Sequence, residues 1–325
     1  MLSEHYRKAG IMTNKKVVIF GAGGFVGPYL AEEFSSHGYE VFGTDIAEPK
    51  SPANSMSSYT VMDMLNPSEV ASFIGSTRPD YVVNLAAISS VGDSWRIPQK
   101  TIAVNVNGTL NILEAVRKAE LHARILLIGS SEEYAVSDSP ISEDYELNGG
   151  NPYGISKIAQ ENFAEIYRSS YGLDIVSTRT FNHTGIGQPE KFVLPGFVSQ
   201  AAKIHNSGKD GKIYVGNLSV RRDFGDVRDM VSAYRMLLES DTHSKVFNVG
   251  SGVCLSLAEL LDYIVSLAAQ RIEVIVSPEK LRPIDNPVIW CDNSLLRAET
   301  GWTSRYTIYD TIREMFSAMT GENML

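Results

Sequence analysis

Residues 16–27 read KVVIFGAGGFVG, and this stretch decides the fold. It opens with a short β-branched run that ends at a glycine, as expected of a strand buried in a parallel sheet. Gly21, Gly24 and Gly27 follow at intervals of three residues, and a helical pattern continues over 29–37. The stretch therefore predicts a strand, a tight glycine turn and a helix in direct succession.

The same alternation of strands and helices continues along the chain. Further strands are predicted at 40–44, 59–62, 81–85, 124–128 and 175–180, and further helices at 68–76, 101–119 and 156–171. Strands that alternate with helices form a doubly wound parallel sheet with helices on both faces. The expected fold class is therefore α/β, with a Rossmann-type sheet.

The three glycines suit a dinucleotide in this context. Gly21 can make the tight turn, Gly24 lets the backbone approach a pyrophosphate, and Gly27 lets helix and strand pack closely. The pyrophosphate would rest on N–H groups at the helix N-terminus, around Phe25 and Val26. The alternative is a set of turn glycines without a ligand, but the order of strand, loop and helix favours a cofactor site.

Two aspartates at strand ends extend this prediction. Asp45 lies 24 residues after Gly21 and ends the second strand. A carboxylate there can accept hydrogen bonds from both ribose hydroxyls of NAD and would repel a 2′-phosphate. Asp63, with Met64 beside it, ends the third strand, where a carboxylate could take the adenine amino group. NAD(H) is the cofactor that these residues favour.

A candidate catalytic group follows in the second half of this domain. Tyr153 and Lys157 stand at positions i and i+4 near the start of a predicted helix, so they share one face. A cation one turn away favours tyrosinate and is expected to lower the pKa of the tyrosine from about 10. Ser130 follows the strand at 124–128, at the sheet edge where ligands bind, and could align a substrate oxygen with Tyr153.

The domain organisation follows from a change of rhythm after about residue 182, where prolines and glycines separate shorter elements. We predict an NAD(P)-binding domain over 15–182, with a segment near 220–250 that returns to the sheet through a strand at 246–249. Residues 183–325 are then mainly a smaller C-terminal α/β domain that binds the substrate. A cleft between the two domains is the expected ligand site.

Charge and cysteine content argue against several classes of function. The net charge of the 325-residue chain is −9, which does not suit a nucleic-acid partner. Cys254 and Cys291 lack metal-type spacing, so no metal site is predicted. No apolar run is long enough to predict a membrane span. Residues 1–14 lack the apolar stretch of a signal peptide and are interpreted as a disordered leader, so we expect a cytoplasmic protein.

These motifs resemble those of the extended short-chain dehydrogenase/reductases that act on nucleotide sugars. Besides the glycine loop and the tyrosine–lysine pair, the resemblance includes NLAA at 84–87, NVNGT at 105–109 and RDF at 222–224, and it covers about residues 16–317. It implies that Leu85, Ala86 and Ala87 line the cofactor and that Asn105 braces the active site. It also implies NADP(H) as a second possible cofactor.

Further strings narrow the resemblance to enzymes of GDP-sugars. They are SSVGDSW at 89–95, GSSEEY at 129–134, RTFNH at 179–183 and LRP at 281–283. These strings are similar to those of GDP-4-keto-6-deoxy-D-mannose reductases, and GDP-mannose 4,6-dehydratases are similar as well. The resemblance implies reduction of the 4-keto group of a GDP-4-keto-6-deoxy-hexose to GDP-D-rhamnose or a C4 epimer. It assigns substrate contacts to Ser131, Asn182, Arg222 and Arg282.

Three alternatives stay open at this point. Glu132 could be the base of a dehydratase, but the reductases carry a carboxylate at the same place, so Glu132 does not decide between them. A 4-epimerase is also possible. A catalytically inactive dinucleotide-binding protein is the alternative outside enzymes, although intact Ser130, Tyr153 and Lys157 argue against it. By the same resemblance we expect a homodimer, formed through apolar faces of the helices at 105–119 and 153–171.

Overall fold

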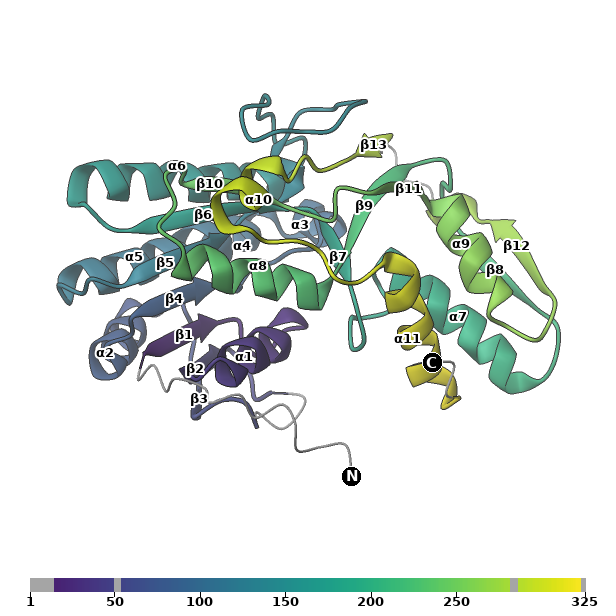
Figure 1. Cartoon of the computed structure of the whole chain (residues 1–325), viewed down its shortest axis with the longest axis horizontal. Helices are drawn as coiled ribbons and strands as arrows, with labels where there is room; N and C mark the ends of the chain where they lie inside the picture. Colours follow the sequence, from purple (N-terminus) through teal and green to yellow (C-terminus); the bar gives the residue numbers. More distant parts are fainter. Residues whose placement is uncertain (1–14, 50–53, 281–285, 323–325) are drawn as a thin grey trace. The chain divides into compact units, whose positions relative to one another are not determined.

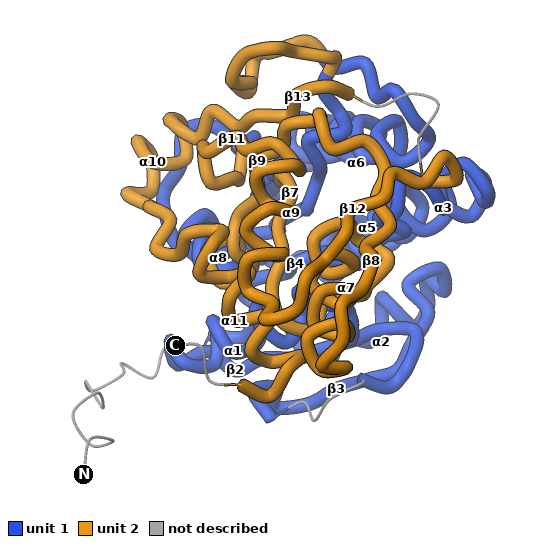
Figure 2. Tube along the Cα trace, turned by 90° about the vertical axis from the view of Figure 1, so that its right-hand side faces the viewer, with its two compact units in different colours: residues 1–134, 147–179, 231–247 blue, residues 135–146, 180–230, 248–325 orange. Residues whose placement is uncertain are grey.

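The computed structural model describes residues 15–49, 54–280 and 286–322. These residues fall into two compact units, shown in blue and orange in Figure 2. Unit 1 takes its residues from 1–134, 147–179 and 231–247, and unit 2 takes its residues from 135–146, 180–230 and 248–325. The leader expected at 1–14 lies outside the described residues.

The division into units differs from the predicted domains in two segments. Residues 135–146 belong to unit 2, although they were expected in the first domain. The segment that returns to unit 1 is 231–247, whereas the prediction placed it near 220–250. The strand at 221–226 pairs within unit 2, which explains why the returning segment is shorter than expected.

Unit 1 is built on a parallel sheet whose seven strands follow the order β10-β6-β5-β4-β1-β2-β3 (Figure 1). The strands are β1 (Lys16–Phe20), β2 (Glu40–Asp45), β3 (Ser58–Val61), β4 (Tyr81–Asn84), β5 (Arg124–Ile128), β6 (Ile175–Thr180) and β10 (Val246–Val249). The pairs from β3 across to β6 are all parallel. The chain winds outward from β1 to β3 and restarts beyond β1 with β4. The order thus reverses between β1 and β4, where such sheets bind ligands.

Helices cover both faces of this sheet (Figure 1). They are α1 (Val26–Ser36), α2 (Pro67–Thr77), α3 (Val91–Arg96), α4 (Pro98–Ile102), α5 (Gly108–Lys118), α6 (Pro152–Tyr171) and α8 (Val227–Glu239). α2, α5 and α6 pack together on one face. α8 lies against α1 on the other, where Arg235 pairs with Glu33 at 2.8 Å. The predicted doubly wound α/β fold is confirmed.

The apolar runs of the sequence become the central strands because helices cover them on both sides. Val17, Val18 and Ile19 of β1 have no exposed surface. All residues of β4 and β6 are buried as well. A strand without a solvent face needs no polar alternation, which is why β1 reads as a continuous apolar stretch.

The helix predicted over 101–119 is interrupted in the structure. α4 ends at Ile102, a π-helical turn η1 covers Ala103–Asn107, and α5 begins at Gly108. A Cβ at Gly108 would lie 2.5 Å from Cε of Met64, so the segment after β3 passes close to this point. A π-turn widens the backbone without a distinctive change of residue types, and periodicity alone does not detect it.

Two helices begin earlier than predicted. α1 starts at Val26 and not at residue 29, directly after the glycine loop. α6 starts at Pro152, ahead of the pattern at 156–171, and it includes both Tyr153 and Lys157 as predicted. Asn151 caps α6, because its side-chain oxygen accepts a hydrogen bond from the backbone N–H of Gly154 at 2.9 Å. Tyr153 therefore lies in the first turn of a capped helix.

Unit 2 contains a sheet in the order β11-β9-β13, with β7 paired to β9, and a separate parallel pair of β8 and β12. The strands are β7 (Asn182–Thr184), β8 (Gly211–Val215), β9 (Arg221–Asp226), β11 (Cys254–Ser256), β12 (Ile272–Val276) and β13 (Val288–Ile289). The helices are α7 (Val193–Ser207), α9 (Leu257–Ser266), α10 (Ser294–Thr300) and α11 (Ile308–Thr320), with a 3-10 turn η3 at Pro278–Lys280. Phe197, Ile213, Leu260 and Phe316 join α7, β8, α9 and α11 in one apolar core.

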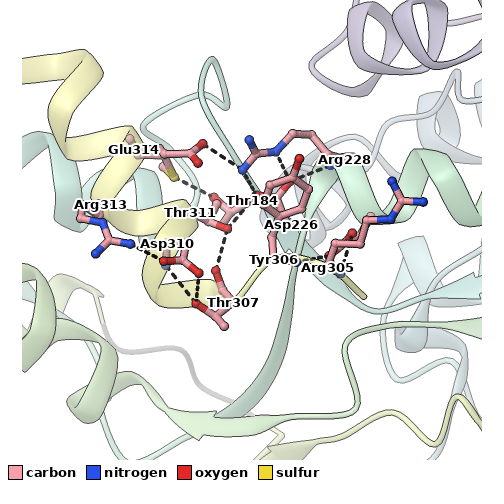
Figure 3. A network of polar contacts seen from close by, with 12 residues as sticks. Thr184, Asp226, Arg228, Arg305, Tyr306, Thr307, Asp310, Thr311, Arg313 and Glu314 are labelled. Atoms are coloured by element: carbon pink, nitrogen blue, oxygen red, sulfur yellow. Dashed lines mark hydrogen bonds and ion pairs between the residues drawn. The ribbon is translucent and has the colours of Figure 1, made fainter. Parts of the chain in front are cut away.

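A polar network ties α11 to the end of β9 (Figure 3). The carboxylate of Asp226 accepts hydrogen bonds from the Arg228 guanidinium at 2.8 and 2.7 Å and from the Thr311 hydroxyl at 2.7 Å. Arg228 also pairs with Glu314 at 2.8 Å and lies 3.6 Å from the ring centroid of Tyr306. Asp226, Arg228 and Glu314 thus each face an opposite charge.

Across the part of the chain that the structure describes, no helix is long and apolar enough to span a membrane. Cys254 and Cys291 are both buried and free. Within the same residues, no group of three or more His, Cys, Asp or Glu side chains could hold a metal ion.

Candidate active site

The glycine loop between β1 and α1 needs glycine for steric reasons. Gly21 has a φ of +81°, which side chains rarely tolerate, and its N–H donates to the carbonyl of Thr44 at 2.9 Å. A Cβ at Gly21 would lie 2.6 Å from the backbone nitrogen of Ala86, and one at Gly27 would lie 2.2 Å from the carbonyl oxygen of Ala22. The first glycine thus makes the turn and the third lets α1 pack closely on the loop, as predicted.

The middle of the loop is more open. A Cβ at Gly24 would meet only the carbonyl oxygen of Gly21 within 4 Å, at 3.2 Å. Phe25 precedes the first turn of α1 and supplies no side-chain cap. A bare backbone with uncapped N–H groups at a helix N-terminus is the arrangement that binds a pyrophosphate. The loop, including Val26 at the start of α1, therefore fits a dinucleotide.

Asp45 lies against this loop at the end of β2. One carboxylate oxygen accepts a hydrogen bond from the N–H of Gly23 at 3.1 Å, and the other accepts from the N–H of Ile46 at 2.7 Å. Tyr59 of β3 is also close, since a Cβ at Gly23 would lie 2.7 Å from its hydroxyl oxygen. Burial, with the charges of Asp45 and Glu48, raises the pKa of Tyr59 to about 12, so its hydroxyl stays protonated.

Asp63 and Met64 occupy the loop after β3. The carboxylate of Asp63 accepts a hydrogen bond from the N–H of Leu65 at 2.9 Å, which makes it part of a local turn. Met64 is nearly buried, and its carbonyl accepts a hydrogen bond from the side chain of Asn111 at 2.9 Å. The adenine contact expected of this segment stays a prediction.

The segment after β4 runs beside the glycine loop. The N–H of Leu85 donates to the carbonyl of Phe20 at 2.9 Å. The N–H of Ala86 donates to the side chain of Asn84 at 3.1 Å, and Asn84 in turn donates to the Thr109 hydroxyl at 3.0 Å. Residues 85–87, Ala87 included, are half-buried, so this backbone can border a bound cofactor.

Asn105 connects this segment to the helix that carries Tyr153. It lies in the π-helical turn η1 and has no exposed surface. Its side chain accepts a hydrogen bond from the N–H of Ile88 at 2.8 Å and donates to the Ser156 hydroxyl at 2.8 Å. Ser156 donates to the carbonyl of Tyr153 at 2.6 Å. The bracing expected of Asn105 thus has a direct physical route to Tyr153.

Ser130, Tyr153 and Lys157 come together at the carboxyl end of β5. The Tyr153 side chain is 8% exposed, and a hydrogen bond with Ser130 acts on its hydroxyl. The ammonium of Lys157 donates to the carbonyl of Ile128 at 2.6 Å and to the side chain of Gln160 at 3.2 Å. It lies 6.0 Å from the centroid of the Tyr153 ring.

The electrostatics of this group differ from the sequence-based expectation. Burial is the largest cause that raises the pKa of Tyr153 above its ordinary value, and the hydrogen bond with Ser130 lowers it. Lys157 was expected to lower that pKa. Instead burial also acts on the lysine and brings the pKa of Lys157 down to about 8. Both groups are therefore protonated near neutral pH, as a proton donor and its supporting cation must be.

Glu132 lies in the 3-10 turn η2 (Ser131–Glu133), beside the start of α6. Its carboxylate accepts a hydrogen bond from the side chain of Asn151 at 2.8 Å. A Cβ at Gly154 would lie 2.2 Å from the carbonyl oxygen of Glu132, so the turn and the helix are in close contact. Ser131, the candidate substrate contact in the same turn, is buried.

The sequence of the whole site matches a known family. The model of the family described as GDP-mannose 4,6 dehydratase matches residues 18–315. The chain belongs to this family. It is therefore an NAD(P)-dependent enzyme of the extended short-chain dehydrogenase/reductases that act on nucleotide sugars, as the sequence motifs predicted.

Individual members of this family carry different activities. A GDP-6-deoxy-D-mannose reductase of Pseudomonas aeruginosa is 31% identical over 258 residues, which cover 78% of this chain and 84% of that protein. A GDP-mannose 4,6-dehydratase of Vibrio cholerae is 28% identical and covers 94% of each chain. The crystal structure of RMD from Pseudomonas aeruginosa complexed with NADPH superposes with a TM-score of 0.82 at 27% identity, over 94% of this chain and 99% of that one.

In the present chain, two of the predicted substrate residues lie on neighbouring strands of unit 2. Asn182 on β7 is in register with Phe224 on β9, and Arg222 lies two residues before Phe224. The guanidinium of Arg222 is nearly buried and donates to the carbonyl of Arg221 at 2.9 Å. Arg282 lies outside the described residues.

Three residues that contact the candidate site were not predicted from the sequence: Tyr59, Glu133 and Asn151. Glu133 is fully buried, and its carboxylate accepts a hydrogen bond from the N–H of Ser130 at 2.6 Å. A serine followed three residues later by a glutamate is the signature of a capping box, and an asparagine before a proline is typical of a helix start. Both patterns were present at Ser130 and Asn151. The contact of Tyr59 with the glycine loop has no local signature.

Proposed function

We propose that this chain reduces the 4-keto group of a GDP-4-keto-6-deoxy-hexose, giving GDP-D-rhamnose or a C4 epimer. The observation that carries the proposal is the joint position of Ser130, Tyr153 and Lys157 at the end of β5, next to Asn105. The reductase of Pseudomonas aeruginosa, at 31% identity, supports the choice of substrate class.

The side chains have distinct roles in this reaction. The glycine loop at 21–27 would hold NAD(P)H, which would supply the hydride for the carbonyl carbon. The Ser130 hydroxyl hydrogen-bonds the carbonyl oxygen, and the Tyr153 hydroxyl gives its proton to that oxygen as the new alkoxide forms. Lys157, a cation below about pH 8, favours the tyrosinate that is left behind.

A dehydratase is the second candidate, and Glu132 is the observation that favours it. Asn151 holds the Glu132 carboxylate at 2.8 Å, beside the helix that carries Tyr153. A carboxylate fixed in this place could abstract a proton next to the ketone formed by transient oxidation. NAD would then be regenerated in each turnover, so no net NADH would be consumed.

We further propose that Asp45 gives a preference for NAD(H), although NADPH was bound in the related RMD structure. One oxygen of Asp45 accepts a hydrogen bond from Gly23 in the loop expected to hold the dinucleotide, and a 2′-phosphate there would meet a carboxylate. Asp45→Ala should improve kcat/KM for NADPH relative to NADH by roughly tenfold or more. Asp63→Ala is the matched control, since it should affect both cofactors alike. An unchanged ratio in Asp45→Ala would contradict the assignment.

For the substrate we propose that Asn182, Arg222 and Arg282 bind the diphosphate and that Ser131 contacts the sugar. Arginines form charge-assisted contacts with phosphate oxygens, which suits a dianionic group. Arg222→Gln should raise KM for the nucleotide sugar with little change in kcat.

We also propose a homodimer that uses the outer face of α6. An apolar face of the helix at 105–119 was expected at this interface, but its residues Ile112, Leu113 and Val116 in α5 are fully buried in the core of their own chain. On α6, in contrast, Ile155 and Ile166 are about half exposed. Light scattering of the purified chain and of Ile166→Glu distinguishes a dimer from a monomer.

The experiment that tests the function follows cofactor absorbance in parallel reactions. The first contains GDP-4-keto-6-deoxymannose with NADH or NADPH, and the second contains GDP-mannose with NAD. Consumption of reduced cofactor in the first supports the reductase. A 4-keto product in the second, without net NADH, makes the chain a dehydratase with Glu132 as base. If neither reaction gives a change in cofactor absorbance or a product, GDP-sugars are rejected as substrates. UDP- and dTDP-sugars would then be tested in the same way.

A further inference from the structure

Glu133 is a buried acid to which the proposed reaction assigns no step. It ends the 3-10 turn η2 and has no exposed surface. One carboxylate oxygen accepts a hydrogen bond from the N–H of Ser130 at 2.6 Å. The Ser130 hydroxyl accepts one from the N–H of Glu132 at 3.2 Å. The backbone of the catalytic serine is thus held by the side chain three residues after it.

Glu133 and Lys157 both form hydrogen bonds with the backbone of residues 128–130 at the end of β5. The ammonium of Lys157 donates to the carbonyl of Ile128 at 2.6 Å, and the carboxyl of Glu133 binds the N–H of Ser130. Gly129 lies between these two groups, and a Cβ there would lie 2.4 Å from the Glu133 oxygen. Two buried ionisable side chains, Lys157 and Glu133, therefore bind the residues directly before and after Gly129.

The Glu133 carboxyl is only partly satisfied. Its second oxygen is buried and has no hydrogen-bond partner among the described residues. The charged groups that act on it are Glu161, Arg179 and Lys157. Arg179 already binds Glu161 through two hydrogen bonds, at 3.0 and 2.6 Å. Arg179 acts on Glu133 more strongly than Lys157 does, but Glu133 is the charged group that acts on Lys157.

We propose that Glu133 is a positioning residue that anchors Ser130 and, once it ionises, becomes the buried counter-charge of Lys157, and that it thereby sets the upper pH limit of the catalytic group. The last clause of this proposal rests on the proposed function. The anchoring and the charge balance do not, since they concern the protein chain alone.

The direction of the effect follows from the charges. Burial raises the pKa of Glu133 to about 8 and lowers the pKa of Lys157 to about 8, so the two titrate together. An ionised Glu133 raises the pKa of Lys157 and that of Tyr153. Both groups then keep their protons to higher pH. A chain without this charge would lose the proton donor and the cation earlier on the alkaline side.

The first test titrates Lys157 without any substrate. Isotope-labelled lysine gives an NMR resonance for Lys157 that is assigned by its loss in Lys157→Met. Glu133→Gln keeps the side-chain volume and an acceptor for Ser130, but it removes the charge. We expect the Lys157 midpoint to fall by about one pH unit or more. Glu165→Gln is the control, because that carboxylate is also on α6 but 67% exposed. An unchanged midpoint in Glu133→Gln overturns the charge balance.

The second test follows turnover against pH. In Glu133→Gln the alkaline limb of kcat/KM should move down by about one pH unit, with kcat near neutral pH retained. Glu133→Leu also loses the anchor of Ser130, and its kcat should fall roughly ten- to a hundredfold. An unmoved limb in the first variant, or full kcat in the second, overturns the positioning role. A wild-type chain that reduces no nucleotide sugar refutes the proposed function, and the lysine titration then decides on Glu133 alone.

Discussion

Glu133 in unit 1 and Asp226 in unit 2 are two buried carboxylates with opposite surroundings. Asp226 accepts two hydrogen bonds from the guanidinium of Arg228, one from its backbone N–H and one from Thr311, so its charge and its lone pairs are matched. Glu133 accepts one hydrogen bond, from the N–H of Ser130, and its second oxygen has no partner among the described residues. All the hydrogen-bonding capacity of Asp226 is used within a structural network, whereas that of Glu133 is only partly used.

This difference separates structural polar groups from groups that can respond to protons. The hydrogen bond with Asp226 raises the pKa of Arg228, so this guanidinium stays charged at any working pH. Burial raises the pKa of Glu133 to about 8 and lowers that of Lys157 to the same range. Incompletely compensated groups with shifted pKa values are typical of functional sites. We therefore expect the chemistry in unit 1, and three predictions test this contrast.

Tyr153→Phe should have the largest effect on the unit 1 side. Loss of the hydroxyl removes the proton donor, and we expect kcat to fall about a thousandfold or more. NADH affinity and the urea midpoint should stay close to wild type, because the ring still fills its site. Tyr167→Phe is the control on the same helix, where the hydroxyl donates to Glu114 at 2.8 Å. Retained turnover in Tyr153→Phe would show that another group gives the proton.

The residues of this first prediction could be found from the sequence because their arrangement is local. The glycine loop is a turn followed by a helix, and Tyr153 and Lys157 are one helical turn apart. Spacing along the chain is then equivalent to position in space. The doubly wound parallel sheet followed from the alternation of apolar strands with helices, which is also a local property.

The remainder of the site depends on contacts between distant segments. Asn105 reaches Ser156, which is 51 residues away in the chain, and Tyr59 reaches the glycine loop from another strand. The burial of Glu133 and the raised pKa of Tyr153 depend on the packing around β5 and α6, for which no single residue type is diagnostic. The capping box of Ser130 and Glu133 could be predicted from the sequence, but the complete burial of Glu133 could not.

Arg228→Met should have the next largest effect, on the unit 2 side of the comparison. It leaves Asp226 buried without its cation, and loss of one partner of a buried pair costs about 3 kcal/mol in the free energy of unfolding. A lower urea midpoint would show this loss. Lys203→Met removes an exposed pair with Glu190 and should cost less than about 1 kcal/mol. Equal midpoints in the two variants would mean that the network of Figure 3 contributes no more than a surface pair.

The smallest effect is a pH dependence that only the unit 1 carboxylate should produce. Because the pKa of Glu133 is raised from 4.5 to about 8, the folded chain holds this proton more tightly than the unfolded chain does. The contribution of Glu133 to stability is complete below the unfolded pKa and is lost as the pH rises through about 8. Glu133→Gln abolishes this loss, so its free energy of unfolding should gain on wild type as the pH rises from 4.5 to about 8.

Urea unfolding of both chains across this pH range measures the difference directly. Lys157 acts with the opposite sign above about pH 8, because its lowered pKa lets the folded chain release a proton before the unfolded chain does. The gain of Glu133→Gln should therefore appear below that pH. Glu259→Gln removes an exposed capping carboxylate whose pKa is lowered. It should lose stability relative to wild type as the pH rises from acid to neutral. If the stability difference between Glu133→Gln and wild type did not vary with pH, Glu133 would be as fully compensated as Asp226, and the contrast between the two units would fail.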